Sequence, residues 1–203
     1  DNQTKEFLND IRFSGQRLLA TINNVLEMAN LEAGRIELDE STIDLSRMLK
    51  RVVEKFHTAA SDKGISLDAR GAEQAVFLRG DYDVIRRAIG NIVSNAIKFT
   101  QDGGVYISAM SRPSGDIEIA VTDTGVGMTQ EEALAIIEPF RQADTSLSGT
   151  HEGSGLGVPL TKALLRLHGG ELEIQSEPSV GTTISVILPA DRVQDAAATP
   201  DTV

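Results

Sequence analysis

Residues 81–100 read Asp81-Tyr-Asp-Val-Ile-Arg-Arg-Ala-Ile-Gly-Asn-Ile-Val-Ser-Asn-Ala-Ile-Lys-Phe-Thr100. At about 100° per residue, the rotation of an α-helix, the apolar side chains of this segment fall on one stripe. The stripe consists of Ile85, Ala88, Ile89, Ile92, Ala96 and Phe99. The segment is therefore predicted to form an amphipathic helix over residues 82–99, with its apolar stripe toward the core.

The opposite face of this helix has an unusual polar composition. Arg87, Asn91, Asn95 and Lys98 lie together on it, with no carboxylate among them. The amide oxygen of asparagine suits a hard cation such as Mg²⁺, and arginine and lysine pair with phosphate oxygens. The face indicates either a site for a magnesium nucleotide or a polar helix surface without a ligand, and the helix alone does not decide between them.

Composition limits the proteins to which such a helix can belong. The chain has 203 residues, 40% hydrophobic and 24% charged, as in one or two ordinary globular domains. Lysine and arginine number 19 against 30 acidic residues, and this net charge of −11 argues against nucleic acid as a partner.

Location is constrained by what the sequence lacks. No apolar run approaches the ~18 residues of a membrane span, and no signal peptide opens the sequence. The absence of cysteine excludes disulfides and thiolate chemistry. We expect a cytoplasmic location, in a parent protein that is either free or anchored to the inner membrane.

A second periodic segment lies near the start of the chain, at residues 7–29. Small or apolar residues recur there at alternating spacings of four and three, namely Ile11, Gly15, Leu18, Ile22, Val25 and Ala29. Such a heptad pattern needs a partner helix. The segment is either a helix that packs within its own chain or half of a helical hairpin that dimerises into a four-helix bundle. Because the chain starts almost at this helix, we expect it to be part of a longer protein.

The remainder is predicted to be a two-layer α/β sandwich of the α+β class. Its other helices are expected at residues 45–62, capped by Asp44, and at residues 157–168. A hinge with a strand is expected at residues 31–38. Further strands are indicated at residues 65–69, 75–78, 105–109, 117–123, 171–175 and 183–188.

Four of these strands carry apolar residues at alternate positions only. A sheet that is apolar on one side is usually antiparallel or mixed, with helices over that side. The last residues, from about residue 191, are rich in alanine, aspartate and threonine and are expected to be disordered.

Asp123 ends one predicted strand and shares the parity of its apolar residues, so its carboxylate is expected to point toward the helices. A carboxylate there needs a partner. Behind it, Gly125 and Gly127 let the backbone turn tightly and approach a flat group closely. A buried carboxylate can accept the exocyclic amino hydrogen of adenine, which guanine does not offer at that place. By itself the motif also fits a plain turn.

Gly153-Ser-Gly-Leu-Gly157 leads directly into the predicted helix at residues 157–168. Pro159 is tolerated in the first turn of a helix, and the N–H groups at a helix start can bind phosphate. Neither a Walker loop nor a Rossmann fingerprint occurs, which excludes these two classes of nucleotide site.

In this order the motifs resemble those of two-component sensor histidine kinases of the HisKA/HATPase_c type, in the GHKL superfamily with its Bergerat fold. Residues 91–100 match the N box, 123–127 the G1 box, 138–140 the F box, 153–157 the G2 box and 181–183 the closing Gly-Thr motif. The amino-acid sequences of residues 138–144 and 167–170 resemble those of the DivJ/PleC-like subclass.

The resemblance implies four parts of the chain. Residues 1–30 would be the second helix of the dimerisation and histidine phosphotransfer hairpin, and residues 31–43 a linker. Residues 44–190 would form the catalytic and ATP-binding domain, and residues 191–203 a disordered tail.

The resemblance also implies roles for single residues around ATP. Asn95 would bind Mg²⁺, and Asn91 and Lys98 would lie at the triphosphate as catalytic groups. Asp123 would read adenine, assisted through water by Thr183.

The glycines would line the nucleotide. Gly125 and Gly127 would line the base, while Gly155, Leu156 and Gly157, in one loop with Gly153, would present N–H groups to phosphate. Residues 128–155 would form a mobile lid. Two positions depart from the family pattern, which often has glutamine at Arg87 and a residue other than proline at Pro159.

One position separates the chemistries within the superfamily. Its ATPase clamps place a glutamate four residues before the metal-binding asparagine, as general base for water. Asn91 stands there in this chain and cannot take a proton from water. The γ-phosphoryl group is therefore expected to be kept for another acceptor.

In the family that acceptor is a histidine followed by Glu or Asp, then by Leu or Phe, Arg, Thr or Ser, and Pro, and no such segment occurs in this sequence. His151 is followed by Glu152 but then by Gly153 and Ser154, so it does not match. His57, His151 and His168 stand in other sequence contexts. The resemblance implies a catalytic domain that transfers the γ-phosphoryl of ATP to a histidine outside this chain, for relay to the receiver domain of a response regulator. The full protein would be a homodimer through its hairpin. A non-catalytic nucleotide-binding regulatory module and a GHKL ATPase are the alternatives.

Overall fold

The computed structural model describes residues 2–70, 76–139 and 155–194, which fall into two compact units, Asp1–Ile36 and Glu37–Val203. No helix within these ranges is both long and apolar enough to cross a membrane.

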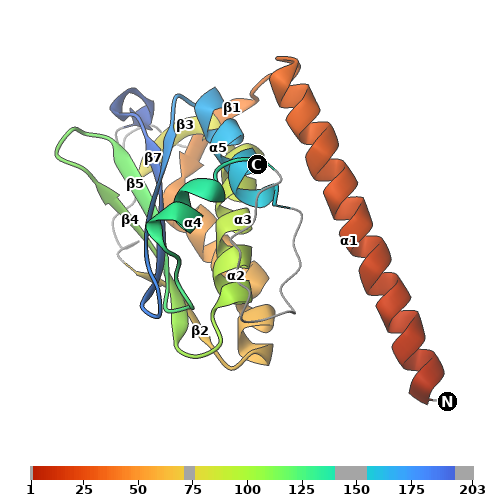
Figure 1. The fold of residues 1–203 in the computed structure, drawn as a ribbon. Coiled ribbons are helices and arrows are strands. Elements are labelled where there is room, and N and C mark those ends of the chain that lie inside the picture. The colour runs from red at the N-terminus through yellow and green to blue at the C-terminus, as the bar shows by residue number, and fades with distance from the viewer. Residues whose placement is uncertain (1, 71–75, 140–154, 195–203) are drawn as a thin grey trace. The chain divides into compact units, whose positions relative to one another are not determined.

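The first unit is a single helix, α1 (Asn2–Glu32), which confirms the helix predicted at residues 7–29 (Figure 1). The strand predicted at residues 31–38 is wrong. The helix continues through residue 32, and in the turn that follows it the φ of +63° at Gly34 allows the Arg35 N–H group to bond the Asn30 carbonyl oxygen at 3.0 Å. Large apolar side chains of α1 are exposed, and these are Phe7, Leu8, Ile11, Leu18, Leu19, Ile22, Val25 and Leu26.

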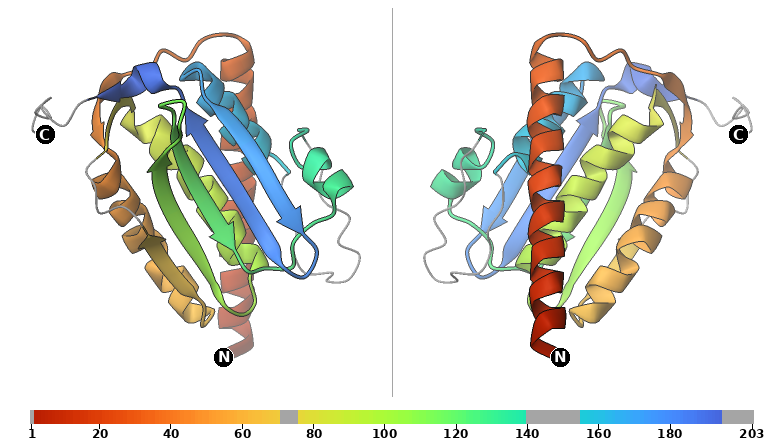
Figure 2. Two further views of the ribbon diagram at one scale, coloured as in Figure 1. Left: turned by 90° about the vertical axis from the view of Figure 1, so that its left-hand side faces the viewer. Right: turned by 90° about the vertical axis from the view of Figure 1, so that its right-hand side faces the viewer.

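The second unit contains a five-stranded mixed sheet in the order β2-β4-β5-β7-β6. The strands are β2 (Ser66–Arg70), β4 (Gly104–Ser111), β5 (Ile117–Asp123), β6 (Glu171–Glu177) and β7 (Gly181–Leu188). Only the β2–β4 pair of this sheet is parallel. Helices α2 (Leu45–Asp62), α3 (Tyr82–Phe99) and α5 (Gly157–Leu167) lie on one side of the sheet (Figures 1 and 2). The predicted two-layer α+β sandwich is confirmed.

A second, three-stranded sheet has the order β1-β3-β8 and was not predicted. It consists of β1 (Glu40–Asp44), β3 (Phe77–Asp81) and β8 (Val193–Gln194), and the strand predicted at residues 75–78 belongs to it. The short helix η1 (Ala190–Arg192) precedes β8, so the beginning of the expected disordered tail is ordered. Residues 195–203 lie outside the described residues.

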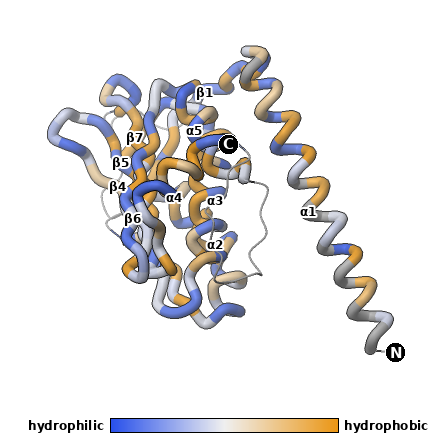
Figure 3. Tube along the Cα trace, in the orientation of Figure 1, coloured by the Kyte–Doolittle hydropathy of each residue, from blue (hydrophilic) through white to orange (hydrophobic). Residues whose placement is uncertain are grey.

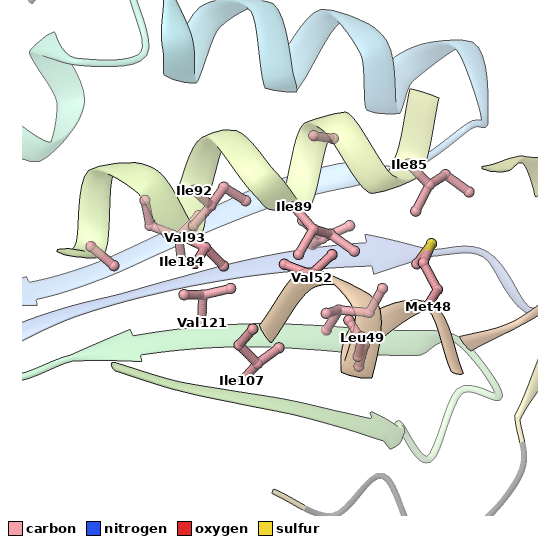
Figure 4. Close-up of a cluster of buried hydrophobic side chains, with 14 of the residues drawn as sticks. Met48, Leu49, Val52, Ile85, Ile89, Ile92, Val93, Ile107, Val121 and Ile184 are labelled. Carbon is pink, nitrogen blue, oxygen red and sulfur yellow. The ribbon is translucent and has the colours of Figure 1, made fainter. Parts of the chain in front are cut away.

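The core between helices and sheet follows the predicted periodicities. Ile85, Ile89 and Ile92 of α3 meet Ile107 and Val121 of the sheet, and Met48, Leu49 and Val52 of α2 complete the cluster (Figure 4). Each fully buried aliphatic side chain contributes about 1.5–3 kcal/mol. Figure 3 shows that hydrophobic and hydrophilic stretches alternate along the chain. The apolar stripe of α3 therefore fixes which side of this helix faces away from the sheet.

The start of α3 is held by Asp81. Its Oδ1 atom accepts a hydrogen bond from the Val84 N–H group at 3.0 Å, and its Oδ2 atom accepts one from the Asp39 N–H group at 3.1 Å. Its own N–H group donates to Nε2 of His168 at 3.0 Å. His168 is fully buried, and burial lowers its pKa, which keeps the ring neutral and able to accept this bond.

The end of α3 is held by a lysine from another element. The Nζ atom of Lys63, the residue after α2, donates to the carbonyl oxygens of Ile97, Lys98 and Thr100 at 2.7, 2.7 and 2.8 Å. These oxygens stand at the helix end, where the backbone lacks partners of its own and a cation is favourable. Lys63 therefore serves as the cap of α3.

We predict that Lys63→Met lowers the free energy of unfolding by about 1–2 kcal/mol. Hydrogen bonds to a charged group contribute roughly 1.5–3 kcal/mol, and the exposure of Lys63 to solvent reduces this value. Chemical denaturation followed by circular dichroism measures the change. Lys50→Met, at an exposed position of α2, is the matched control, and equal effects of the two substitutions would contradict the capping role.

Candidate functional site

Several of the predicted site residues, namely Asn95, Asp123, Gly125 and Gly157, lie where the end of α3, the start of α5, the end of β5 and the start of β7 come together. Asn95 of α3 faces the start of α5, because a Cβ atom added to Gly157 would lie 3.5 Å from its Nδ2 atom. Gly125, after β5, lies against the end of α3, where an added Cβ atom would be 2.6 Å from the Phe99 carbonyl oxygen. The fold therefore joins three motifs that are far apart in the sequence.

Asp123, the last residue of β5, is half-buried at this junction. Its Oδ1 atom accepts hydrogen bonds from the N–H groups of Gly125 at 2.8 Å and of Thr182 at 3.3 Å. Burial raises the pKa of this carboxyl, and the two bonds oppose the increase. Within the described residues its Oδ2 atom accepts no hydrogen bond, so it can accept one from a ligand.

The glycines after Asp123 are required by close packing. Gly127 has a φ of +63°, and a Cβ atom there would lie 1.9 Å from the carbonyl oxygen of Glu177. A Cβ atom at Gly125 would also lie 2.8 Å from Oδ1 of Asp123. Larger residues cannot enter without moving the backbone. The role of these glycines in lining a base stays a prediction.

Thr183 does not lie beside Asp123, so the prediction that it assists this carboxylate is wrong. In the β5–β7 register Thr183 pairs with Thr122, and their hydroxyl oxygens are 3.0 Å apart. Asp123 pairs with Thr182 instead, whose hydroxyl lies 2.8 Å from that of Ser176. Because side chains alternate between the faces of a strand, Thr182 shares the face of Asp123 and Thr183 takes the other.

Sequence reasoning could have found Thr182. The buried residues Ile184, Val186 and Leu188 of β7 set the parity of its helix-covered face, and Thr182 belongs to that series. The closing Gly-Thr motif contains two threonines, and the motif alone does not choose between them.

The polar face of α3 is turned toward two neighbours. Asn95 meets the start of α5, whereas Asn91, one turn earlier, lines a groove between α3 and α2. Both asparagines and Lys98 are half-buried, and the Nζ atom of Lys98 lies 4.7 Å from the centre of the Phe99 ring. The three predicted residues thus occupy one side of a helix whose other side is core.

The start of α5 resembles the helix N-termini that bind phosphate groups. Gly155 has a φ of +68°, and Leu156, the residue before the helix, is buried and has no polar side chain with which to cap it. The first N–H groups of α5 therefore lack the usual side-chain cap, as at anion sites on helix termini. Gly153 lies outside the described residues.

The predicted lid is described only at its two ends. Its first part contains the short helix α4 (Gln130–Ala135), which begins with a capping box between Thr129 and Glu132 and was not predicted. Residues 140–154, which include His151, lie outside the described residues.

Two of the three histidines can be judged as phosphoryl acceptors. His168 is fully buried and uses Nε2 to accept the Asp81 N–H group, so no phosphoryl donor can reach it. His57 is exposed near the end of α2. Neither lies in the acceptor pattern of the family.

Comparisons with known proteins agree with this geometry. Residues 80–192 match the family model described as histidine kinase-, DNA gyrase B-, and HSP90-like ATPase. The non-motile and phage-resistance protein of Caulobacter vibrioides is 39% identical over 93% of this chain and 23% of its own length. The signal transduction histidine-protein kinase BarA of Escherichia coli K12 is 35% identical over 88% of this chain and 20% of its own length.

Among solved structures, full-length ShkA in complex with AMPPNP superposes with a TM-score of 0.83 at 30% identity, over 97% of this chain and 40% of that one. The chain spans about a fifth of the length of the curated relatives it matches.

We predict that Asp123→Asn weakens ATP binding by ~1.5–3 kcal/mol, because its amide can place a donor against the amino group of adenine. Calorimetry with ATP and GTP measures the effect. The unchanged chain should prefer ATP, and the variant should lose this preference.

Acidification provides a control for the same claim. Because burial raises the pKa of Asp123, the ATP affinity of the unchanged chain should fall as pH decreases toward that raised pKa, at a higher pH than an ordinary aspartate would require. The Asn variant should lack this dependence. Equal affinity of the unchanged chain for ATP and GTP would contradict recognition of the base by Asp123.

Proposed function

This chain belongs to the family of histidine kinase-, DNA gyrase B- and HSP90-like ATPases, and we propose that it carries the ATP-binding catalytic domain of a sensor histidine kinase. The observation that supports this most directly is the junction of Asp123, Asn95 and the start of α5, which brings a candidate acceptor for the base, a candidate magnesium ligand and a candidate phosphate-binding helix start into one site. In the proposal the domain binds ATP and transfers its γ-phosphoryl group to a histidine outside this chain.

The adenine end of the site would be formed by Asp123 and Thr182. The Oδ2 atom of Asp123 would accept a hydrogen bond from the amino group of the base. Thr182, whose N–H group binds Oδ1 of Asp123, takes the place predicted for Thr183. Gly125 and Gly127 would border the base, since neither carries a side chain that could obstruct it.

The triphosphate would lie along α3 toward the start of α5. The N–H groups that follow Leu156 would meet phosphate oxygens, and Lys98 and Asn91 would lie beside them. Gly153 would belong to the same loop.

The residues fit a magnesium ion that is bound chiefly through the nucleotide. Mg²⁺ usually takes one or two protein oxygens and completes its shell with phosphate and water oxygens. Asn95 offers one such oxygen at the start of α5, and the described residues contain no cluster of three acidic or histidine side chains that would hold a metal by itself. When bound, the ion would neutralise charge on the phosphates.

Transfer to a histidine is favoured over hydrolysis by Asn91. A carboxylate at this position would act as base for water, and an amide cannot. Positioning of the triphosphate against an external imidazole would then account for catalysis. A GHKL ATPase would need a general base at position 91, where this chain has asparagine. No residue of the site favours a non-catalytic module.

The parent protein would extend beyond this chain. Residues 1–30 would be the second helix of a hairpin through which two copies dimerise, and the exposed apolar side chains of α1 support this. Residues 31–43 would link it to the catalytic domain at residues 44–190. A response regulator receiver domain would take the phosphoryl group from the histidine. The DivJ/PleC-like subclass and the cytoplasmic location, free or membrane-anchored, stay predictions.

We predict that the chain binds Mg-ATP, yet neither labels itself nor hydrolyses ATP above a trace rate. A separately purified hairpin that carries the acceptor histidine should become labelled when added, since transfer needs a delivered imidazole and the bound triphosphate. Incubation with γ-labelled ATP, with acid-labile phosphohistidine and released phosphate read separately, measures both reactions.

Two variants connect these outcomes to the asparagines. Asn95→Ala should abolish labelling of the hairpin, because it removes the proposed magnesium ligand. Asn91→Glu should increase phosphate release, because it installs a base. Strong labelling of the chain on its own histidines would overturn the proposal, and rapid phosphate release by the unchanged chain would assign it to the ATPases.

A further inference from the structure

A groove of about 770 Å³ lies between α2 and α3. It is lined by four cationic side chains, Arg51 and Lys55 from α2 and Arg86 and Arg87 from α3. Its volume exceeds what a single ion needs and is sufficient for several side chains of another protein.

The groove is positively charged, whereas the chain as a whole is negatively charged. The whole chain has a net charge of −11, yet the groove holds four cations and one carboxylate, Asp83. Asp83 forms an ion pair with Arg86, in which Oδ1 of Asp83 lies 2.7 Å from Nη2 of Arg86. Within the described residues neither Arg51 nor Lys55 forms an ion pair, and like charges four residues apart on a helix repel each other. The cluster therefore lowers the stability of the isolated helix and favours a negatively charged partner.

The groove also adjoins the proposed catalytic site. Asn91, which lies at the triphosphate in the proposed function, is itself one of the groove-lining residues. In-line transfer requires the acceptor imidazole to approach the γ-phosphoryl group closely. The protein segment that delivers the imidazole must then approach the surface beside Asn91, which the groove shares.

We propose that this basic groove docks an acidic face of the protein segment that carries the acceptor histidine. The inference rests on the proposed function and adds a recognition surface to it. Complementary charge at such a surface speeds encounter and selects the partner, while the chemistry stays with the residues at ATP. Arg51 and Lys55 are positioning residues in this sense, and they touch neither nucleotide nor metal.

The test compares two charge reversals on α2 of the full 203-residue chain. Arg51→Glu with Lys55→Glu changes the groove, and Arg47→Glu with Lys50→Glu makes the same change of charge at exposed positions outside it. The first readout is equilibrium binding of the purified histidine-bearing hairpin, followed by fluorescence anisotropy at several salt concentrations. The groove variant should bind about tenfold or more weakly with little dependence on salt, and the control should bind like the unchanged chain.

The second readout is the rate of hairpin labelling as a function of hairpin concentration. The groove variant should show a raised KM for the hairpin, with kcat and ATP affinity unchanged. Replacing surface carboxylates of the hairpin by amides should remove the difference between the variants.

The outcomes separate the two claims. Equal hairpin binding by the groove variant and the control would overturn the docking site while leaving the kinase assignment intact. A loss of ATP affinity in the groove variant would also overturn it, because the cations would then serve the nucleotide. If the unchanged chain does not label the hairpin, but hairpin binding still depends on the groove, the proposed function is overturned and the docking site is supported.

Discussion

Helix α3 forms the core with one side and the candidate site with the other, so any shift of this helix changes both. Its two ends are fixed by contacts from distant parts of the chain. Asp81 caps its start and accepts a bond from Asp39, while Lys63 binds three carbonyl oxygens at its end. His168, at the end of α5, binds the N–H group of Asp81 and thus connects the two helices that border the proposed triphosphate. The asparagines of α3 are positioned by these contacts as much as by its apolar stripe.

The site itself depends on close approach of backbone segments. The turn after β5 lies against the end of α3 and against the turn between β6 and β7, and glycines stand where a side chain would prevent contact. Through this packing Asp123 receives hydrogen bonds from two N–H groups and keeps an oxygen for a ligand. A rigid acceptor at one end and uncapped N–H groups at the other suit a ligand with a base and an anionic tail.

Periodicity was sufficient to predict most of this fold from the sequence. The stripes of α2 and α3 and the parity of β5 and β7 gave the helices, the core and the orientation of Asp123, because burial imposes those patterns. Strands β1 and β8 were missed since they are short and are stabilised by pairing with β3. The cap at Lys63 depends on a contact between residues 34 or more positions apart. The closing Gly-Thr motif does not distinguish Thr182 from Thr183, whereas the strand parity of β7 places Thr182 on the face of Asp123.

We propose that one ATP molecule spans the site from Asp123 to Asn95. A crystal structure of the chain with a non-hydrolysable ATP analogue and Mn²⁺, which replaces Mg²⁺ and is located by its anomalous scattering, tests this most directly. We expect a manganese peak within coordination distance of the amide oxygen of Asn95, and the amino group of adenine within hydrogen-bond distance of Asp123. A metal peak away from Asn95, or a base bound elsewhere than at Asp123, would contradict it.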